Sequence, residues 1–142
     1  MHLIVDGHGG DPVKLQDLDL ISRFLDEYPA AIGMTKIVPP LVYTYHGKTP
    51  EDWGVSGFVL IAESHISVHT FPDRAYVNID IFSCKAFDGD ASLRQVEETF
   101  ALDRTRVQVL ERGEEHATSR EAFRGMVRER VSLAPARPPS DG

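Results

Sequence analysis

The sequence predicts an α+β protein, a two-layer sandwich in which helices pack on one face of an antiparallel sheet. Most strand-like segments follow one another with short turn signals between them, which is typical of hairpin-linked strands. Two amphipathic helical segments lie among the strands, and each has one apolar stripe to bury. The chain of 142 residues fits one domain, and its hydrophobic content of 42% is sufficient for a core.

The first predicted elements are a strand and a helix. The segment "HLIVD" reads as a short buried strand that the glycine-rich "GHGG" closes. Asp11 and Pro12 are typical of a helix start, because an aspartate caps the first turn and proline needs no N–H there. Apolar residues then follow at helical spacing, namely Leu15, Leu18, Ile21 and Leu25. We expect this helix to end near Tyr28 and Pro29.

The middle of the chain predicts a run of strands rich in β-branched and aromatic residues. These strands cover residues 41–46, 57–62, 65–71 and 75–83. A second helix is predicted to begin near Asp90, with Leu93, Val96 and Phe100 facing the core. The segment "RVQVLE" predicts the last strand of the domain.

The strand predicted over 65–71 has two chemically different faces. Because successive side chains alternate, Ile66, Val68 and Thr70 share one side of it. The other side carries His65, Ser67, His69 and Phe71. The next strand repeats the pattern, with Val77, Ile79 and Ile81 on the apolar side and Asn78, Asp80, Phe82 and Cys84 opposite. One face of the sheet is therefore expected to be core, and the other to be polar.

A turn at "PDRA" would set the register of these two strands. If Phe71 pairs with Tyr76, then Ser64 faces Ser83, and Cys84 lies beside Glu63. A single cysteine often serves only as a small apolar side chain, and a polar strand face is often merely solvated. Composition and spacing alone therefore indicate a polar cluster and no particular chemistry.

Two familiar kinds of site are not indicated. On a strand, His65 and His69 are spread by roughly 13 Å, too far apart to share a metal ion, and we expect no metal site. Ser64 lacks the G-x-S-x-G setting of a hydrolase nucleophile.

Composition narrows the possible partners. With 22 acidic and 15 basic residues the formal net charge is -7, which disfavours nucleic acid and suits cationic small molecules. Cys84 is the only cysteine, so an internal disulfide is impossible. No N-terminal run is long enough for a signal peptide or a membrane span, and we expect a cytoplasmic protein with no membrane partner.

A resemblance appears in "GVSGFVLIAESHISVHTFPDRAYVNIDIFSCKAFD", residues 54–88. This segment resembles the core of the prokaryotic S-adenosylmethionine decarboxylases, enzymes that cleave themselves and use a pyruvoyl group. The "AESH" and "HTFP" segments and the cysteine that ends the next strand occur in the same order and at the same separations. A weaker similarity in "HLIVDG" and the first helix extends the resemblance over about residues 1–112. We therefore expect a self-processing domain over 1–112. Residues 113–142 are expected to add a charged helical extension near 119–131 and a flexible proline-rich tail.

The resemblance implies a role for five residues. The Ser64 hydroxyl would attack the Glu63 carbonyl, convert the amide to an ester, and then be eliminated, which breaks the chain. His69 matches the histidine that takes the proton from the serine Cα. Ser56 matches a serine that helps to hold the processing intermediate, and Cys84 matches the acid that later returns a proton to the substrate.

The implied cofactor is a covalent pyruvoyl group made from Ser64. Such a group forms a Schiff base with the substrate amine and takes up the electrons left when CO2 departs, as pyridoxal phosphate does elsewhere. The resemblance also implies a homodimer of cleaved protomers with sites near their interface, and S-adenosylmethionine as substrate, which serves spermidine synthesis.

The substrate-binding segment departs from the usual pattern. The family commonly reads "HTWPE" where this chain has "HTFPD", and often has a cysteine near the position of Gly10. Phe71 would stack on adenine, with Tyr43, Tyr45 and Trp53 as other aromatic candidates. Asp73 replaces a glutamate that grips the ribose. Relatives that decarboxylate arginine or ornithine are the alternative reading, and a homologue that keeps the fold but never cleaves is a third.

One distance is left open by the sequence. A straight strand puts His69 about 16 Å from Ser64, too far for proton transfer. A bend or bulge would shorten this distance, or His65 would do part of the work.

Overall fold

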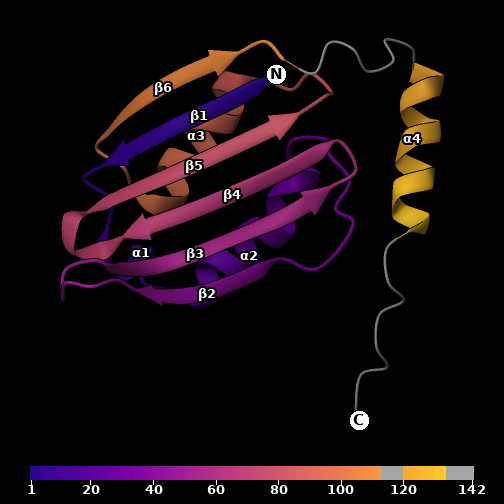
Figure 1. Cartoon of the computed structure of the whole chain (residues 1–142). Coiled ribbons are helices and arrows are strands. Elements are labelled where there is room, and N and C mark those ends of the chain that lie inside the picture. Colours follow the sequence, from indigo (N-terminus) through magenta and orange to yellow (C-terminus); the bar gives the residue numbers. More distant parts are fainter. Residues whose placement is uncertain (113–119, 134–142) are drawn as a thin grey trace.

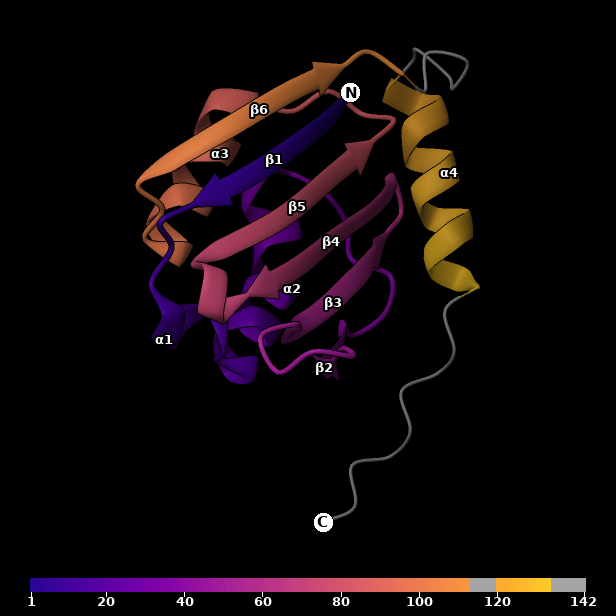
Figure 2. The same cartoon turned by 60° about the vertical axis from the view of Figure 1, so that its left-hand side comes forward.

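The computed structural model of the chain describes residues 1–112 and 120–133. Its centre is a six-stranded sheet in the order β2-β3-β4-β5-β1-β6, in which all neighbouring strands are antiparallel. The helices α1, α2 and α3 lie on one face of the sheet, as Figures 1 and 2 show, and the other face carries no helix from residues 1–112. The predicted α+β sandwich is confirmed.

The elements follow the chain in a simple order. They are β1 (His2–His8), α1 (Pro12–Leu15), α2 (Leu18–Ala31), β2 (Leu41–His46), β3 (Trp53–Ile61), β4 (Ser64–Phe71), a 3₁₀ turn (Pro72–Arg74), β5 (Tyr76–Ser83), α3 (Gly89–Phe100), β6 (Arg104–Leu110) and α4 (Arg120–Ser132). Most strands extend one to four residues beyond the segments that the sequence predicts, because backbone pairing continues past the apolar run.

The prediction of one helix from Asp11 to about Pro29 is wrong in two respects. The segment is divided, because Asp17 caps a second helix by accepting a hydrogen bond from the Leu20 amide at 3.0 Å. The second helix also continues past Pro29 to Ala31. It ends beside Gly33, whose φ of +75° suits glycine, so the chain turns there and not at the proline.

The second predicted helix and the core are confirmed. Asp88 caps α3, and Val96 and Phe100 are fully buried while Leu93 is partly buried. The core lies between the sheet and the helices and contains the apolar side chains of β1, β3, β4 and β5. Ile66 and Val68 on β4 are each 0% exposed, so the predicted apolar face is the one that the helices cover.

The predicted register of β4 and β5 is also confirmed. Phe71 pairs with Tyr76 and Ser64 pairs with Ser83. The connecting 3₁₀ turn ends at Ala75, which takes a left-handed conformation with φ of 46°. This register places Cys84, just past the end of β5, beside the turn that joins β3 to β4.

Helix α4 occupies the region where the sequence predicts a charged helical extension. The predicted proline-rich tail, within residues 134–142, lies outside the described residues, and the domain boundary near residue 112 stays a prediction. Among the described helices, none is long and apolar enough to cross a membrane.

Candidate active site

The turn between β3 and β4 holds the residues at the centre of the predicted chemistry. Ile61 pairs with Ser64, so Ala62 and Glu63 form the whole connection between the strands. Both turn residues are buried, with exposures of 0% for Ala62 and 2% for Glu63, whereas Ser64 is half-buried. The Ala62 amide donates to the Thr35 carbonyl at 2.8 Å, which ties the turn to the segment after α2.

Glu63 is fixed at both its side chain and its main chain. One carboxylate oxygen accepts a hydrogen bond from the Thr35 amide at 3.0 Å. The carbonyl oxygen accepts one from the Cys84 amide at 3.1 Å. This second bond polarises the carbonyl group that Ser64 would attack, and its donor is placed to stabilise an oxyanion there.

The Ser64 hydroxyl contacts the side chain of the next residue. Its Oγ lies 3.2 Å from His65 Nδ1, in a hydrogen bond whose direction depends on the histidine tautomer. His65 packs edge-on against Phe82, with the ring centres 5.8 Å apart. Partial removal from water lowers the pKa of His65, the neighbouring His2 and Arg112 lower it further, and Asp80 opposes them. A neutral imidazole able to accept a proton from Ser64 is therefore favoured.

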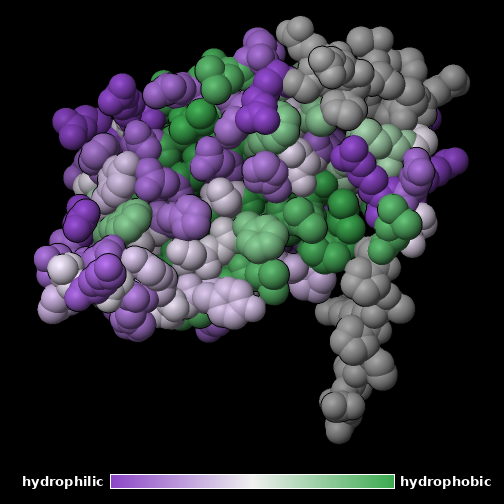
Figure 3. All heavy atoms as spheres, viewed as in Figure 1, coloured by the Kyte–Doolittle hydropathy of each residue, from purple (hydrophilic) through white to green (hydrophobic). Residues whose placement is uncertain are grey.

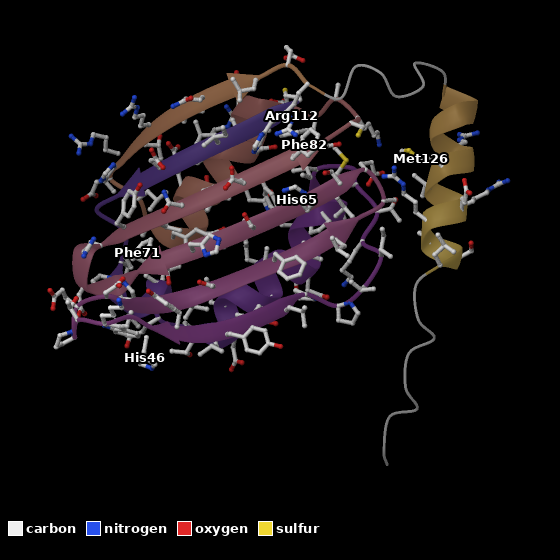
Figure 4. The ribbon with its side chains drawn as sticks, in the orientation of Figure 1. His46, His65, Phe71, Phe82, Arg112 and Met126 are labelled. Carbon is white, nitrogen blue, oxygen red and sulfur yellow. The ribbon has the colours of Figure 1, made fainter. Side chains whose placement is uncertain are left out.

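A polar cluster surrounds His65 on the open face of the sheet. His2 Nε2 lies 3.0 Å from an Asp80 carboxylate oxygen, and Arg112 Nη1 lies 3.3 Å from His2 Nδ1. The Arg112 guanidinium also lies 4.1 Å from the centre of the Phe82 ring. Figure 4 shows His65, Phe82 and Arg112 close together over β4, β5 and the end of β6.

Ser56 and His69 form a separate pair farther along the same face. The two residues pair directly between β3 and β4, and Ser56 Oγ lies 3.0 Å from His69 Nδ1. The register of β4 with both neighbours is unbroken from Ser64 to His69, so no bulge shortens the strand. His69 is therefore about 16 Å from Ser64 of its own chain. Within one protomer the structure brings Ser64 to Glu63, His65 and Cys84, and leaves His69 with Ser56.

The predicted substrate-binding residues lie at the other end of β4 from Ser64. Phe71 packs on Tyr76 with ring centres 5.7 Å apart, and Figure 4 shows it at that end of the strand. The exposed Asp73 carboxylate accepts a hydrogen bond from Trp53 Nε1 at 3.0 Å. Trp53 also stacks with His46, with the ring centres 6.3 Å apart. Phe71, Asp73 and Trp53 are thus gathered, but far from Ser64 of the same chain.

A hollow of about 380 Å³ lies on the open face, between the surroundings of Ser64 and the end of β4 that carries Phe71. It is lined by Leu41, Tyr43, Ser56, Gly57, Phe58, His65, Ser67 and His69. Figure 3 looks onto this face and shows hydrophobic side chains gathered towards the α4 side of it, with polar ones over the opposite side. The hollow therefore has histidines from β4 on one side and exposed apolar groups from β2 and β3 on the other.

Several contributors to the site were not found from the sequence. The Thr35 amide holds the Glu63 side-chain carboxylate, and His2 and Arg112 lower the pKa of His65. All three residues are distant from β4 along the chain. The burial of Glu63 is visible only in the structure, and it requires a donor such as the Thr35 amide, since a buried carboxylate needs one. In the described residues, no group of three or more His, Cys, Asp or Glu side chains is arranged to hold a metal ion.

The fold and the β3–β4 turn are those of an α+β protein in which an internal serine, Ser64, follows a peptide carbonyl that accepts a hydrogen bond. Comparison with known proteins identifies its family. The profile of the family described as "S-adenosylmethionine decarboxylase" matches residues 1–113, and the chain belongs to this enzyme family.

Individual relatives agree with this assignment. The chain is 33% identical over 113 residues to an S-adenosylmethionine decarboxylase proenzyme of Clostridium botulinum (strain Langeland), which covers 79% of this chain and 92% of the relative. It is 31% identical over 119 residues to the S-adenosylmethionine decarboxylase proenzyme of Pyrococcus furiosus, and the match covers 83% of this chain and 81% of the relative. A crystal structure of the adenosylmethionine decarboxylase from Aquifex aeolicus superposes with a TM-score of 0.66 at 28% identity, covering 83% of this chain and 95% of that one.

Proposed function

We propose that this protein is a self-cleaving, pyruvoyl-dependent decarboxylase that converts S-adenosylmethionine to decarboxylated S-adenosylmethionine and CO2. The observation that carries the proposal is the arrangement around the Glu63–Ser64 bond. The carbonyl of this bond accepts the Cys84 amide at 3.1 Å, and the hydroxyl next to it contacts His65 at 3.2 Å. A polarised carbonyl, a nucleophile and a neutral base are what an acyl shift requires.

The first step transfers the Glu63 acyl group from nitrogen to oxygen. His65 accepts the hydroxyl proton of Ser64 while Oγ attacks the Glu63 carbonyl carbon. The Cys84 amide holds the negative oxygen that forms. The C–N bond then breaks, the Ser64 nitrogen takes up a proton, and an ester joins Glu63 to the Ser64 side chain.

The second step breaks the chain. A base removes the Ser64 Cα proton, the Cβ–O bond breaks, and Glu63 leaves as a carboxylate with the bonding electron pair. The dehydroalanine that remains at position 64 tautomerises to an imine, and water hydrolyses this to a pyruvoyl group and ammonia. The family resemblance assigns the base to His69, which in its own chain is about 16 Å away.

We propose that His69 acts on Ser64 of a second copy. In a two-fold dimer the same patch serves both subunits, so if Ser64 of one chain meets the Ser56–His69 pair of the other, the reverse contact forms as well. Phe71 and Asp73, at the same end of β4 as His69, would join this composite site. Both sites would then be complete only in the dimer.

The exposed apolar side chains of the open face support such a dimer. Leu41, Tyr43, Phe58 and Leu60 are 47%, 65%, 41% and 42% exposed. The pairing of Leu41 with Phe58 and of Tyr43 with Ser56 puts these groups on the same face as His69. A contiguous apolar area on a sheet face that no helix of residues 1–112 covers is typical of a protein interface.

In turnover, the pyruvoyl group would supply the electron sink that decarboxylation of an amino acid needs. Cys84, beside the new terminus at position 64, would hold the proton that returns to the substrate carbon. Phe71 would stack on adenine, and Asp73, oriented by Trp53, would accept hydrogen bonds from the ribose. The acidic chain, with its net charge of -7, attracts the sulfonium cation.

We further propose that the product serves as an aminopropyl donor for spermidine synthesis. We place the reaction in the cytoplasm, where a thiol such as Cys84 stays reduced.

The substrate is tested by CO2 release from carboxyl-labelled S-adenosylmethionine, arginine and ornithine, assayed in parallel with the cleaved protein. Release from S-adenosylmethionine alone is expected. Release from arginine or ornithine with none from S-adenosylmethionine would overturn the substrate assignment. No release from any of the three would favour a homologue that keeps the fold without the activity.

A further inference from the structure

A side chain from outside the family match contacts the turn that would be cleaved. Nη1 of Arg130, on α4, donates a hydrogen bond to the Ala62 carbonyl oxygen at 2.5 Å. Ala62 is fully buried and directly precedes Glu63. The match to the family ends at residue 113, so Arg130 belongs to the additional C-terminal segment.

Helix α4 presents one face to the domain. Met126, Val127 and Arg130 are half-buried, while Arg124, Arg128 and Glu129 are exposed. Residues four apart lie on the same side of a helix, so Met126 and Arg130 share the inner side. Figure 2 shows α4 alongside the ends of β3, β4 and β5, and Figure 4 shows Met126 on the side of α4 nearer the sheet. Arg130 therefore reaches the β3–β4 turn from a helix that lies beside it.

We propose that Arg130 is a positioning residue for self-cleavage between Glu63 and Ser64. The inference rests on the function proposed above and adds a residue from the C-terminal segment to it. The Arg130 hydrogen bond holds the turn from the Ala62 side, as the Cys84 amide holds it at Glu63. Two donors thereby fix the two consecutive carbonyl groups before Ser64.

The charge of Arg130 has a second effect on the same reaction. When the ester is eliminated, the electron pair of the Cβ–O bond leaves with the new main-chain carboxylate of Glu63. This negative charge forms one residue from the carbonyl that Arg130 already binds. A guanidinium has five N–H donors and binds carboxylates strongly, so it favours departure of the Glu63 carboxylate.

The test measures the rate of self-cleavage in freshly translated full-length chains by a pulse-chase experiment read on a denaturing gel. Arg130→Ala is expected to slow cleavage about tenfold, the value of one charge-assisted hydrogen bond. Arg130→Lys keeps the positive charge and should recover part of the rate. Arg128→Ala, which removes the same charge from the exposed side of α4, is the matched control and should cleave like the wild type.

Two further measurements separate positioning from simple anchoring of the helix. The thermal midpoint of uncleaved protein is compared between Ser64→Ala and the double variant Ser64→Ala with Arg130→Ala, and little change is expected. Hydroxylamine, which cuts esters, should release residues 1–63 from the slowed Arg130→Ala chains, because the ester accumulates when its elimination slows.

Four results would contradict the inference. Arg130→Ala that cleaves at the wild-type rate would remove Arg130 from the reaction while leaving the proposed function intact. Equal slowing by Arg130→Ala and Arg128→Ala, or slowing matched by a large fall in the thermal midpoint, would indicate a general structural effect. A wild-type chain that does not cleave would overturn both the inference and the function on which it rests.

Discussion

The main-chain amide of Cys84 donates a hydrogen bond to the carbonyl oxygen of Glu63 at 3.1 Å. This contact gives Cys84 two separable contributions, because the amide contacts the bond that is proposed to be cleaved and the thiol is proposed to act on the substrate. Substitution of the side chain leaves the amide in place. The two contributions can therefore be measured in one variant.

Cys84→Ala should cleave at close to the wild-type rate and then lose turnover. Loss of a general acid lowers the rate of product formation by about 100-fold or more. The measurement is amine product formed per cleaved chain, with the extent of cleavage determined on the same sample. Normal turnover by cleaved Cys84→Ala would show that another group returns the proton.

Chains that lack Ser64 and chains that lack His69 should complement each other. Ser64→Ala and His69→Ala should each remain uncleaved alone, because one lacks the nucleophile and the other lacks the base. In the proposed dimer of one chain of each kind, Ser64 of one chain would meet His69 of the other. At equal co-expression about half of the His69→Ala chains should then be cleaved.

The complementation is measured by tagging the two chains differently and following each on a denaturing gel. Mixtures in which neither chain is cleaved would contradict action between protomers. His69→Ala that cleaves alone at the wild-type rate would remove His69 as the base and leave His65 as the candidate.

The sequence pattern predicted much of the sheet because its period of two and one tight turn fix a register. Once Phe71 pairs with Tyr76, Ser64 must face Ser83, and the alternation along β4 then separates the buried Ile66 and Val68 from His65 and His69. The pairing of Ser56 with His69 depends on the register between β3 and β4. The turn between those strands has no Asn-Gly or similar signal, so the pattern alone did not fix it.

Prediction from local sequence patterns failed where a contact joins segments that are distant along the chain. It also failed where a helix N-cap residue interrupts an apolar stripe. Leu15 and Leu18 continue one apolar stripe, yet the Asp17 side chain caps a new helix between them. The contacts of Thr35 with Glu63, of Arg112 with Phe82 and of Arg130 with Ala62 join segments whose spacing carries no period. Such contacts follow from tertiary packing and are visible only in three dimensions.

The rate of cleavage should fall on the acid side with a midpoint below pH 6.5. The neutral form of His65 is the one proposed to accept the Ser64 proton, and protonation removes this form as the pH falls. Partial burial and the neighbouring His2 and Arg112 hold the pKa of His65 below its usual value of 6.5, so the neutral form persists to lower pH.

Arg112→Ala should move this midpoint upward, because it removes a positive charge that lowers the pKa of His65. Arg94→Ala, which removes an exposed arginine of α3, is the matched control and should leave the midpoint unchanged. The measurement is the first-order cleavage rate from about pH 5 to 8, where histidine changes charge. A midpoint well above 6.5 in the wild type would exclude His65 as the base that accepts the Ser64 hydroxyl proton.

Asp73 should affect binding of S-adenosylmethionine more than its conversion. Asp73→Ala is expected to raise KM roughly tenfold, because the proposed charged hydrogen bond to the ribose would be lost. Asp73→Glu should be tolerated. Asp90→Ala, which removes an exposed carboxylate at the start of α3, controls for the change in net charge. An unchanged KM in Asp73→Ala would show that the ribose is bound elsewhere.

Intact mass spectrometry of the purified protein tests the central claim most directly. The wild type should consist of residues 1–63, ending in the free carboxylate of Glu63, and residues 64–142, lighter by one ammonia than the same fragment with a serine terminus. Ser64→Ala should remain whole, and Ser67→Ala, three residues along β4, should still be cleaved. A wild-type chain that stays intact after prolonged incubation would contradict self-cleavage, and a free serine at position 64 would contradict formation of the pyruvoyl group.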